Sequence, residues 1–218
     1  MNLKNFHAAL AFAANAMSAD DVRHYLRGVA IDFAHVEKRS DTTMILVGTD
    51  GSRLNRISLK VDPKDFPTLS RKGKPFILDG KAVAAILAIK KPSDQVEIDL
   101  IMGKETFGPG NDRAKTCTFV ADSLTIRCDL IDGQFPDYRR VMPTIPAPVG
   151  EAVGVDSELL LASAQAYAKL GKALGRRYKK CVMTCSGETA AVRFIGDKEM
   201  MDDTMDIHSP EIALMPMR

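Results

Sequence analysis

The segment DGKAVAAILAIKKP (residues 79–92) carries helix signals at both of its ends. Asp79 precedes a run of strong helix formers, and aspartate is a favoured N-cap because its carboxylate accepts hydrogen bonds from the first unpaired N–H groups. Pro92 cannot continue a helix, since it has no N–H and its ring clashes with the preceding turn. The segment therefore predicts a helix that begins near Gly80 and ends before Pro92.

Two further segments have the same design. Near the N-terminus, apolar residues recur in steps of three and four, which is the stripe of an amphipathic helix, at Leu3, Phe6, Leu10, Ala13 and Met17. The segment SELLLASAQAYAKLGKAL (157–174) follows a possible cap, Asp156, and precedes Gly175, a common C-terminal stop. The three predicted helices begin near residues 3, 80 and 157, so successive starts are 77 residues apart.

Each predicted helix is followed by runs that favour strands. Examples are TMILVGT (43–49), KTCTFVA (115–121) and TAAVRFIG (189–196), in which β-branched and apolar residues dominate. Turn formers such as TDGS and GPGND separate the runs. We therefore predict an α+β fold. One helix with about three antiparallel strands, and a short strand leading in, occurs three times, with the helices on one side of the sheet.

The rhythm also suggests how the chain divides. Two units make a domain of common size, so we predict a first domain over residues 1–131. Residues 132–148 contain four prolines and are predicted to form a connector. The third unit, residues 149–218, would be a C-terminal domain or half-domain.

Bulk composition is that of an ordinary folded protein. The chain has 218 residues, 45% hydrophobic and 27% charged. No run of 18 apolar residues is present, which excludes a membrane-spanning helix, and polar residues interrupt the N-terminal stripe, so a signal peptide is not expected. We expect a cytoplasmic protein whose four cysteines (117, 128, 181 and 185) are reduced and buried rather than zinc ligands.

The charges are balanced in number but uneven in position. A net charge of +2 does not by itself indicate a nucleic-acid binder. The acidic residues gather in DKEMMDDTMD (197–206), whereas Lys81 lies on the second predicted helix and Lys169, Lys172 and Arg176 share one face of the third. Basic helix faces of this kind would bind duplex backbone without reading its sequence. An ordinary solvated helix surface is the alternative.

No catalytic motif stands out. GPGNDR (108–113) lacks the following lysine and helix of a nucleotide-binding loop, and the four histidines lack metal-ligand spacing. The acidic segment 197–206 is interpreted as a solvated loop, because sites for Mg²⁺ need carboxylates fixed on rigid elements. We therefore predict no catalytic residues, no metal and no cofactor. A metal-dependent enzyme acting on nucleic acid is the weaker alternative.

Four segments together resemble the bacterial replicative sliding clamp, the beta subunit of DNA polymerase III. They are DVRHYLRG (21–28), GTDGSRL (48–54), DGQFPDYRRVMP (132–143) and the terminal MPMR (215–218). The likeness covers most of residues 1–143 and returns at the C-terminus. The family's first domain has no counterpart, so the chain resembles a shortened clamp of the kind a phage or plasmid would encode. The resemblance implies a ring with helices around the hole, basic side chains toward DNA and sheets outside, as well as a non-catalytic role.

The resemblance also implies two sets of site residues. The connector would line a pocket for short peptide motifs of polymerases, the clamp loader and repair proteins. By position in the motifs, the pocket residues would be Leu26, Thr49, Gly51, Arg53, Leu54, Pro136, Arg140, Val141, Met215, Pro216, Met217 and Arg218. The DNA-binding residues would be Arg23, His24, Tyr25, Lys81, Lys169, Lys172 and Arg176. Without the resemblance, ordinary interdomain packing would explain the pocket residues.

The sequence departs from the family pattern at two positions, and its length bears on the number of copies in a ring. Ser52 stands where the family usually has histidine, and the chain shows no final leucine after Arg218. A two-domain chain would need three copies to reach the family's six domains. Three units per chain, against the family's twelve, would need four copies. A peptide-binding adaptor of the replication machinery that forms no ring is the competing interpretation.

Overall fold

The computed structural model describes most of the chain in ten stretches. They are residues 1–19, 22–35, 42–62, 75–90, 92–103, 116–142, 155–175, 181–184, 191–196 and 207–215.

The three helices begin at the predicted residues. They are α1 (Leu3–Ala14), α2 (Gly80–Leu87) and α3 (Ser157–Leu174). The Asp79 carboxylate accepts from Lys81 N (2.8 Å). The Asp156 carboxylate accepts from Glu158 N (2.7 Å), and Gly175 closes α3 in the left-handed conformation at φ 74°. The Asn2 side chain caps α1, a role that the apolar stripe alone did not predict.

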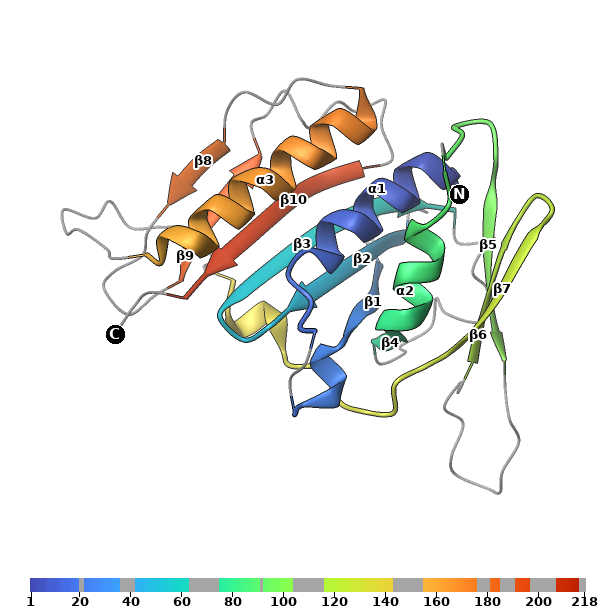
Figure 1. Ribbon diagram of the computed structural model, residues 1–218, viewed down its shortest axis with the longest axis horizontal. Coiled ribbons are helices and arrows are strands. Elements are labelled where there is room, and N and C mark those ends of the chain that lie inside the picture. Colours follow the sequence, from blue (N-terminus) through green and yellow to red (C-terminus); the bar gives the residue numbers. More distant parts are fainter. Residues whose placement is uncertain are drawn as a thin grey trace.

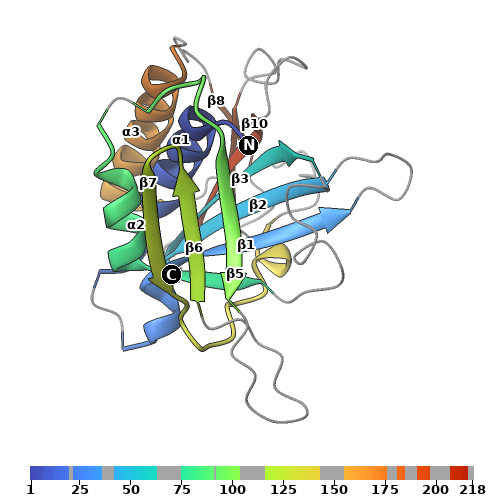
Figure 2. The same cartoon turned by 90° about the vertical axis from the view of Figure 1, so that its right-hand side faces the viewer.

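The strands form two antiparallel sheets, which together with the three helices confirm the predicted α+β class (Figures 1 and 2). A seven-stranded sheet has the order β4-β1-β2-β3-β10-β9-β8, and a three-stranded sheet has the order β5-β6-β7. The strands are β1 (Gly28–His35), β2 (Thr42–Thr49), β3 (Arg53–Val61), β4 (Phe76–Asp79), β5 (Ile98–Gly103), β6 (Thr116–Ala121), β7 (Leu124–Asp129), β8 (Cys181–Thr184), β9 (Val192–Gly196) and β10 (Ile207–Leu214).

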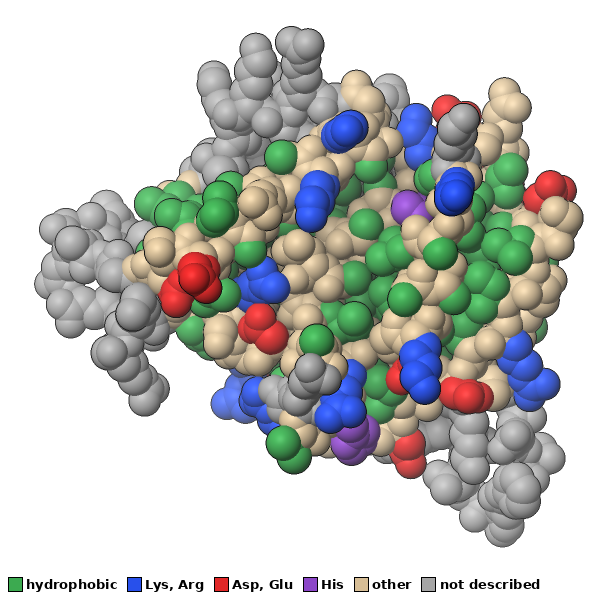
Figure 3. Space-filling view, in the orientation of Figure 1, with side chains coloured by type: hydrophobic (Ala, Val, Ile, Leu, Met, Phe, Trp, Pro, Cys, Tyr) green, Lys and Arg blue, Asp and Glu red, His purple; other side chains and the backbone are tan. Residues whose placement is uncertain are grey.

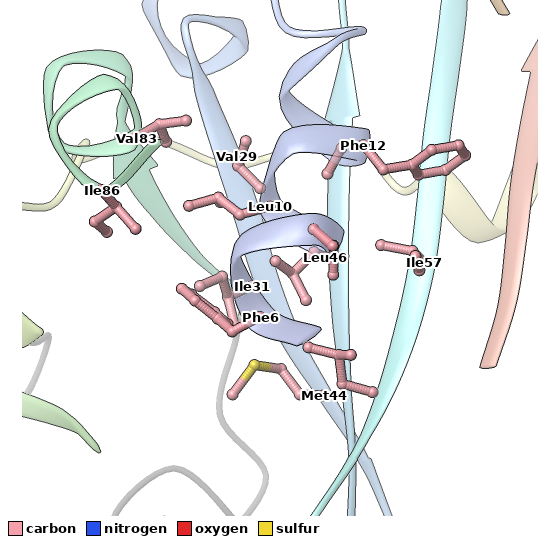
Figure 4. Close-up of a cluster of buried hydrophobic side chains, with 14 of the residues drawn as sticks. Phe6, Leu10, Phe12, Val29, Ile31, Met44, Leu46, Ile57, Val83 and Ile86 are labelled. Carbon is pink, nitrogen blue, oxygen red and sulfur yellow. The ribbon is translucent and has the colours of Figure 1, made fainter. Parts of the chain in front are cut away.

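The helices lie on one face of the seven-stranded sheet. Figure 1 shows α3, α1 and α2 in front of it, and α1 packs against both other helices. The core lies between these layers, where α1 presents Phe6, Leu10 and Phe12 to Ile31, Leu46 and Ile57 of the sheet (Figure 4). Each such side chain contributes roughly 1.5–3 kcal/mol when fully buried. The four predicted stripe residues inside α1 (Leu3, Phe6, Leu10 and Ala13) are all buried.

The units are joined by exchanged segments. We define the first unit as α1 with β1–β3, the second as α2 with β5–β7, and the third as α3 with β8–β10. The strand β4, which leads into α2, pairs with β1 of the first unit. In return Asn2, which leads into α1, bridges Glu97 beside β5 of the second unit. The third unit joins the first through antiparallel pairing of β10 with β3.

The cysteine prediction is confirmed for the two cysteines whose burial is described. Cys117 on β6 and Cys128 on β7 are free, buried and directly opposite one another. Burial raises the pKa of the Cys117 thiol to about 12, so it stays protonated and unreactive at neutral pH. Cys181 lies on β8, and Cys185 lies outside the described residues.

Two further expectations can be compared with the described stretches. None of the helices in these stretches combines the length and the hydropathy that a membrane-spanning helix needs. The stretches also hold no group of three or more His, Cys, Asp or Glu side chains placed to share a metal ion. The acidic segment 197–206 falls outside them.

Candidate functional site

Three of the quoted motifs meet, although they are far apart in sequence. They are the loop 22–27 before β1, the turn 49–54 between β2 and β3, and the connector segment 132–142 after β7. We call these residues, together with Met215, the motif surface. The alternation of the strands sets its location. On β2, Met44 and Leu46 face the helices, whereas Ile45 and Val47 belong to a second apolar cluster with Phe135 and Tyr138.

The connector therefore packs on the sheet face that the helices leave open. Figure 2 shows the short 3-10 helix η2 (Tyr138–Arg140, yellow) on the side of the sheet opposite to α1 and α3. Its anchor is a buried polar contact, since the Tyr138 hydroxyl donates to the Asp32 carboxylate (2.8 Å) and Arg139 also pairs with that carboxylate. Burial, and then the charge of Asp32, raise the pKa of Tyr138. The large residues of the connector are thus explained by packing.

The turn between β2 and β3 is held by its own side chains. Asp50 accepts from the backbone N–H groups of Ser52 (2.8 Å) and Arg53 (3.0 Å), and from the Arg53 Nε at 3.1 Å. Gly51 has φ 95°, a left-handed conformation that favours glycine. The Thr49 hydroxyl donates to the Arg53 carbonyl (2.7 Å). Asp50 was not among the predicted site residues, although Asp-Gly is a familiar turn signal.

The C-terminal strand reaches the same turn. In the β3–β10 ladder Leu54 lies opposite Ala213, and Met215 N donates to the Ser52 carbonyl (2.9 Å). The Met215 side chain is 39% exposed. The structure thus brings Met215 to the predicted pocket residues of the turn, while Pro216, Met217 and Arg218 lie outside the described residues.

The loop 22–27 joins this surface rather than the helices. Arg23 Nη2 donates to the Asp50 carbonyl (3.4 Å), and the His24 ring Nε2 lies 3.0 Å from the Asp132 carbonyl. A Cβ at Gly133 would lie only 3.0 Å from the Tyr25 Cβ, so glycine permits this close approach. The predicted DNA-contact loop and the predicted peptide pocket are therefore neighbours.

The predicted pocket residues differ in accessibility. Leu26 is 1% exposed and Leu54 is 5% exposed, so they support the surface from below. Thr49 is also buried, while Arg53 and Val141 are half-buried. The exposed members are Gly51, Pro136, Arg140 and Met215. The arrangement offers apolar side chains and exposed backbone next to two arginines, which suits an extended peptide with apolar anchors.

The predicted DNA-binding lysines lie on α2 and α3. Lys81, Lys169 and Lys172 are exposed, and Arg176 falls outside the described residues. On α3, Lys169 and Lys172 point away from the buried positions Tyr167 and Leu170 because of the helical period. Figure 3 shows Lys and Arg side chains along α3 and around α2 on this side of the molecule. We call the exposed side of the three helices the helix face.

About the first two thirds of the chain match a known protein family in sequence. The family model of the DNA polymerase III beta subunit, central domain, matches residues 1–137. The beta sliding clamp of Proteus mirabilis is 30% identical over 131 residues, and that of Escherichia coli K12 is 31% identical over 134 residues. Each alignment covers 60% of this chain and 30% of the relative, so the chain matches about a third of the length of these curated relatives.

Solved structures agree on the fold over the whole chain. The sliding clamp of Pseudomonas aeruginosa superposes with a TM-score of 0.64 at 17% identity, covering 100% of this chain and 66% of that one. The beta clamp of Helicobacter pylori, in complex with 3,4-difluorobenzamide, gives a TM-score of 0.66 at 13% identity and 65% coverage of that chain. A Bartonella birtlesii clamp bound to griselimycin gives a TM-score of 0.62 at 17% identity, covering 65% of that chain.

Proposed function

This chain belongs to the DNA polymerase III beta subunit family, and from that membership we propose that it is a sliding clamp, a non-catalytic processivity factor that encircles duplex DNA. It would tether a replicative polymerase and other clamp-binding proteins through short peptides. The observation that carries the proposal is the convergence of the loop, the turn, the connector and Met215 into one motif surface on a clamp fold.

The motif surface supports the peptide-binding role. Its exposed Pro136 and Met215 offer apolar contact, and methionine adapts to partners of different shape. Arg140 is exposed and can orient a carbonyl or carboxylate of a bound peptide. Because Tyr138, Phe135 and Leu54 hold this surface from beneath, a peptide would meet a preformed site and lose less binding free energy to ordering.

The helix face supports the DNA role. Lys81, Lys169 and Lys172 present point charges that attract phosphates but carry no base-reading geometry. Contacts of this kind are independent of sequence and weaken as salt rises. Weak backbone contacts would let the protein slide, so retention would come from enclosure.

Enclosure requires several copies. Counted by domains, three copies would complete the six domains expected of the family ring, and counted by units, four copies would complete its twelve. We propose a closed homo-oligomeric ring of three or four chains.

Retention on circular and linear DNA tests this function. The protein, loaded on a nicked circular plasmid and passed through a sizing column, is expected to remain with the circle and to be lost after a restriction enzyme cuts it. Equal retention on the circle and on the cut molecule would contradict enclosure. Peptide binding without any retention would support the non-ring adaptor instead.

A further inference from the structure

The sheets have four edges in the described part of the chain, and two of them are covered by neighbouring segments. At one edge of the seven-stranded sheet, β4 is bridged by Leu130, and Ile131 N donates to the Ile77 carbonyl (2.9 Å). At one edge of the three-stranded sheet, β5 is covered by the N-terminal residues, where Ile98 N donates to the Met1 carbonyl (2.7 Å). The remaining edge strands, β7 and β8, pair on one side only, with β6 and β9 respectively, and have no strand on their outer side in the described ladders.

The pairing of β3 with β10, which we call the β3–β10 joint, shows how the last strand of one unit can pair with the last strand of another. Each is the last strand of its unit, the pairing is antiparallel, and their helices pack beside them, with the rings of Phe12 and Tyr167 5.3 Å apart. A charged pair closes the joint on the face away from the helices. Arg56 lies opposite Glu211, with Nη1 to Oε2 at 3.1 Å, and Arg193 reaches the other oxygen at 2.6 Å.

Strand β7 stands in the same position in the second unit. It is the last strand, it packs against α2 as β3 packs against α1, and it pairs with β6 alone among the described strands. Its face away from the helix exposes Thr125, Arg127 and Asp129, whereas Cys128 is buried on the other face. In the β3–β10 joint the basic and the acidic side chain come from different strands, whereas β7 carries one of each, Arg127 and Asp129.

Those charges are self-complementary. A two-fold axis at Cys128 would place Arg127 of one copy opposite Asp129 of another, and the axis would repeat the pair. Cross-strand pairs of opposite charge stabilise antiparallel pairing, and like charges directly opposite destabilise it. The β7 strand of a second copy therefore meets the charge requirement of the β7 edge.

The third unit is open at the other end of the chain. The first two units exchange their leading segments and pack α1 against α2, a reciprocal relation like that of a local two-fold axis. The described part of the third unit has no such partner. One flank of α3 exposes Leu160 (40%) and Leu161 (60%), followed by exposed Ala164 and Ala168. Hydrophobic side chains gather at the N-terminal end of α3 in Figure 3. Met183 on β8 is 56% exposed.

We propose that the ring closes through two isologous junctions, β7 with β7 of a second copy and the third unit with the third unit of another. This rests on the proposed sliding-clamp function, which sets the ring at twelve units. The order of units along one chain is second, first, third, so alternating junctions of the two kinds close a ring of four chains. Neighbouring chains then face opposite ways, and the motif surface occurs on both faces of the ring.

Charge exchange on β7 tests the first junction. The substitution R127D places two aspartates opposite one another at each β7 axis and is expected to raise the dissociation constant of that junction about tenfold. The double variant R127D/D129R restores opposite charges and is expected to restore the assembly. In a head-to-tail ring β7 would meet a different strand, so the double variant would remain impaired, and this outcome would overturn the proposal.

Absolute mass, measured by light scattering, tests the whole arrangement. The protein is expected at four times the 23.8 kDa of one chain. At protein concentrations near the dissociation constant of the junctions, R127D alone and L161D alone are each expected to give two-chain particles. The variant that combines both substitutions is expected to give single chains. The control A11D, at an exposed position in the middle helix, should leave four chains. A three-chain particle, or R127D without effect, would overturn the inference.

The two proposals fail in different ways. A four-chain particle that responds to the variants as expected but is not retained on circular DNA would contradict the clamp function and support the proposed assembly. Retention on circular DNA by a three-chain ring would support the function and contradict the isologous junctions. The same conclusion would follow from a retained ring whose assembly, once lost in R127D, is not restored in R127D/D129R.

Discussion

At the scale of single residues, Asp32 links the connector to the sheet. Asp32 is 4% exposed, and its carboxylate accepts from both the Tyr138 hydroxyl and the Arg139 guanidinium. A buried carboxylate needs such partners, because leaving it unpaired costs much of its lost hydration. The contact orders the segment that carries Pro136, Arg140 and Val141.

The substitution Tyr138→Phe tests this anchor. Removing the hydroxyl deprives the buried Asp32 of one donor, so the free energy of unfolding is expected to fall by about 1–3 kcal/mol. Urea denaturation at fixed protein concentration measures it. Tyr25→Phe, at a half-buried tyrosine of the neighbouring loop, should change stability by less than about 0.5 kcal/mol. Equal losses in the two variants would show that the Asp32 contact contributes no special stability.

The pair Pro136→Ala and Met215→Ala tests the motif surface. Both side chains are exposed, so their removal should leave folding and assembly unchanged. The affinity for a polymerase-tail peptide, measured by fluorescence polarisation, is expected to fall about tenfold or more, as for truncation of apolar anchors. Ile101→Ala, at a 56% exposed position on β5, is the control. An unchanged peptide affinity in the double variant would remove these residues from the site.

At the residue scale, the sequence predicted contacts between near neighbours in the chain but not contacts between distant residues. The caps Asp79 and Asp156 were predictable because a cap acts within three residues. The partnership of Asp32 with Tyr138 joins positions 106 residues apart, and local pattern contains no trace of it. The motif residues were placed only through the family resemblance, since pattern alone favoured ordinary interdomain packing over a pocket.

At the scale of elements, α3 combines a buried side, a basic side and an apolar flank. The same 3.6-residue period that buries Tyr167 and Leu170 sends Lys169 and Lys172 outward. The start of the helix and the direction of its lysines followed from sequence, because both depend on neighbouring residues. The pairing of β10 with β3 did not, because strands pair according to topology rather than local composition.

The substitution Lys172→Glu tests the helix face. A carboxylate there would repel phosphates, so binding to duplex DNA is expected to weaken and its dependence on salt to become shallower. The matched control is Lys60→Glu on β3, where Leu59 faces the helices and Lys60 therefore faces the opposite side of the sheet. Binding isotherms at several salt concentrations measure both variants. Equal weakening by both would mean that only net charge matters and that the helix face is not the DNA-facing side.

At the scale of the whole molecule, the repeat explains the fold and points to a ring. The predicted rhythm of 77 residues corresponds to the observed helix starts at Leu3, Gly80 and Ser157. The division at residues 131 and 148 remains a prediction, and the seven-stranded sheet shows that strands of the first and third units share one sheet across it. Periodicity could reveal the units, but only coordinates could show which strands join them.

An image of the assembled particle by electron microscopy tests the central claim most directly. The account predicts a closed ring with a hole wide enough for duplex DNA, with α1, α2 and α3 lining the hole and both sheets outside. A particle without such a hole, or one with Lys169 and Lys172 on its outer rim, would contradict it.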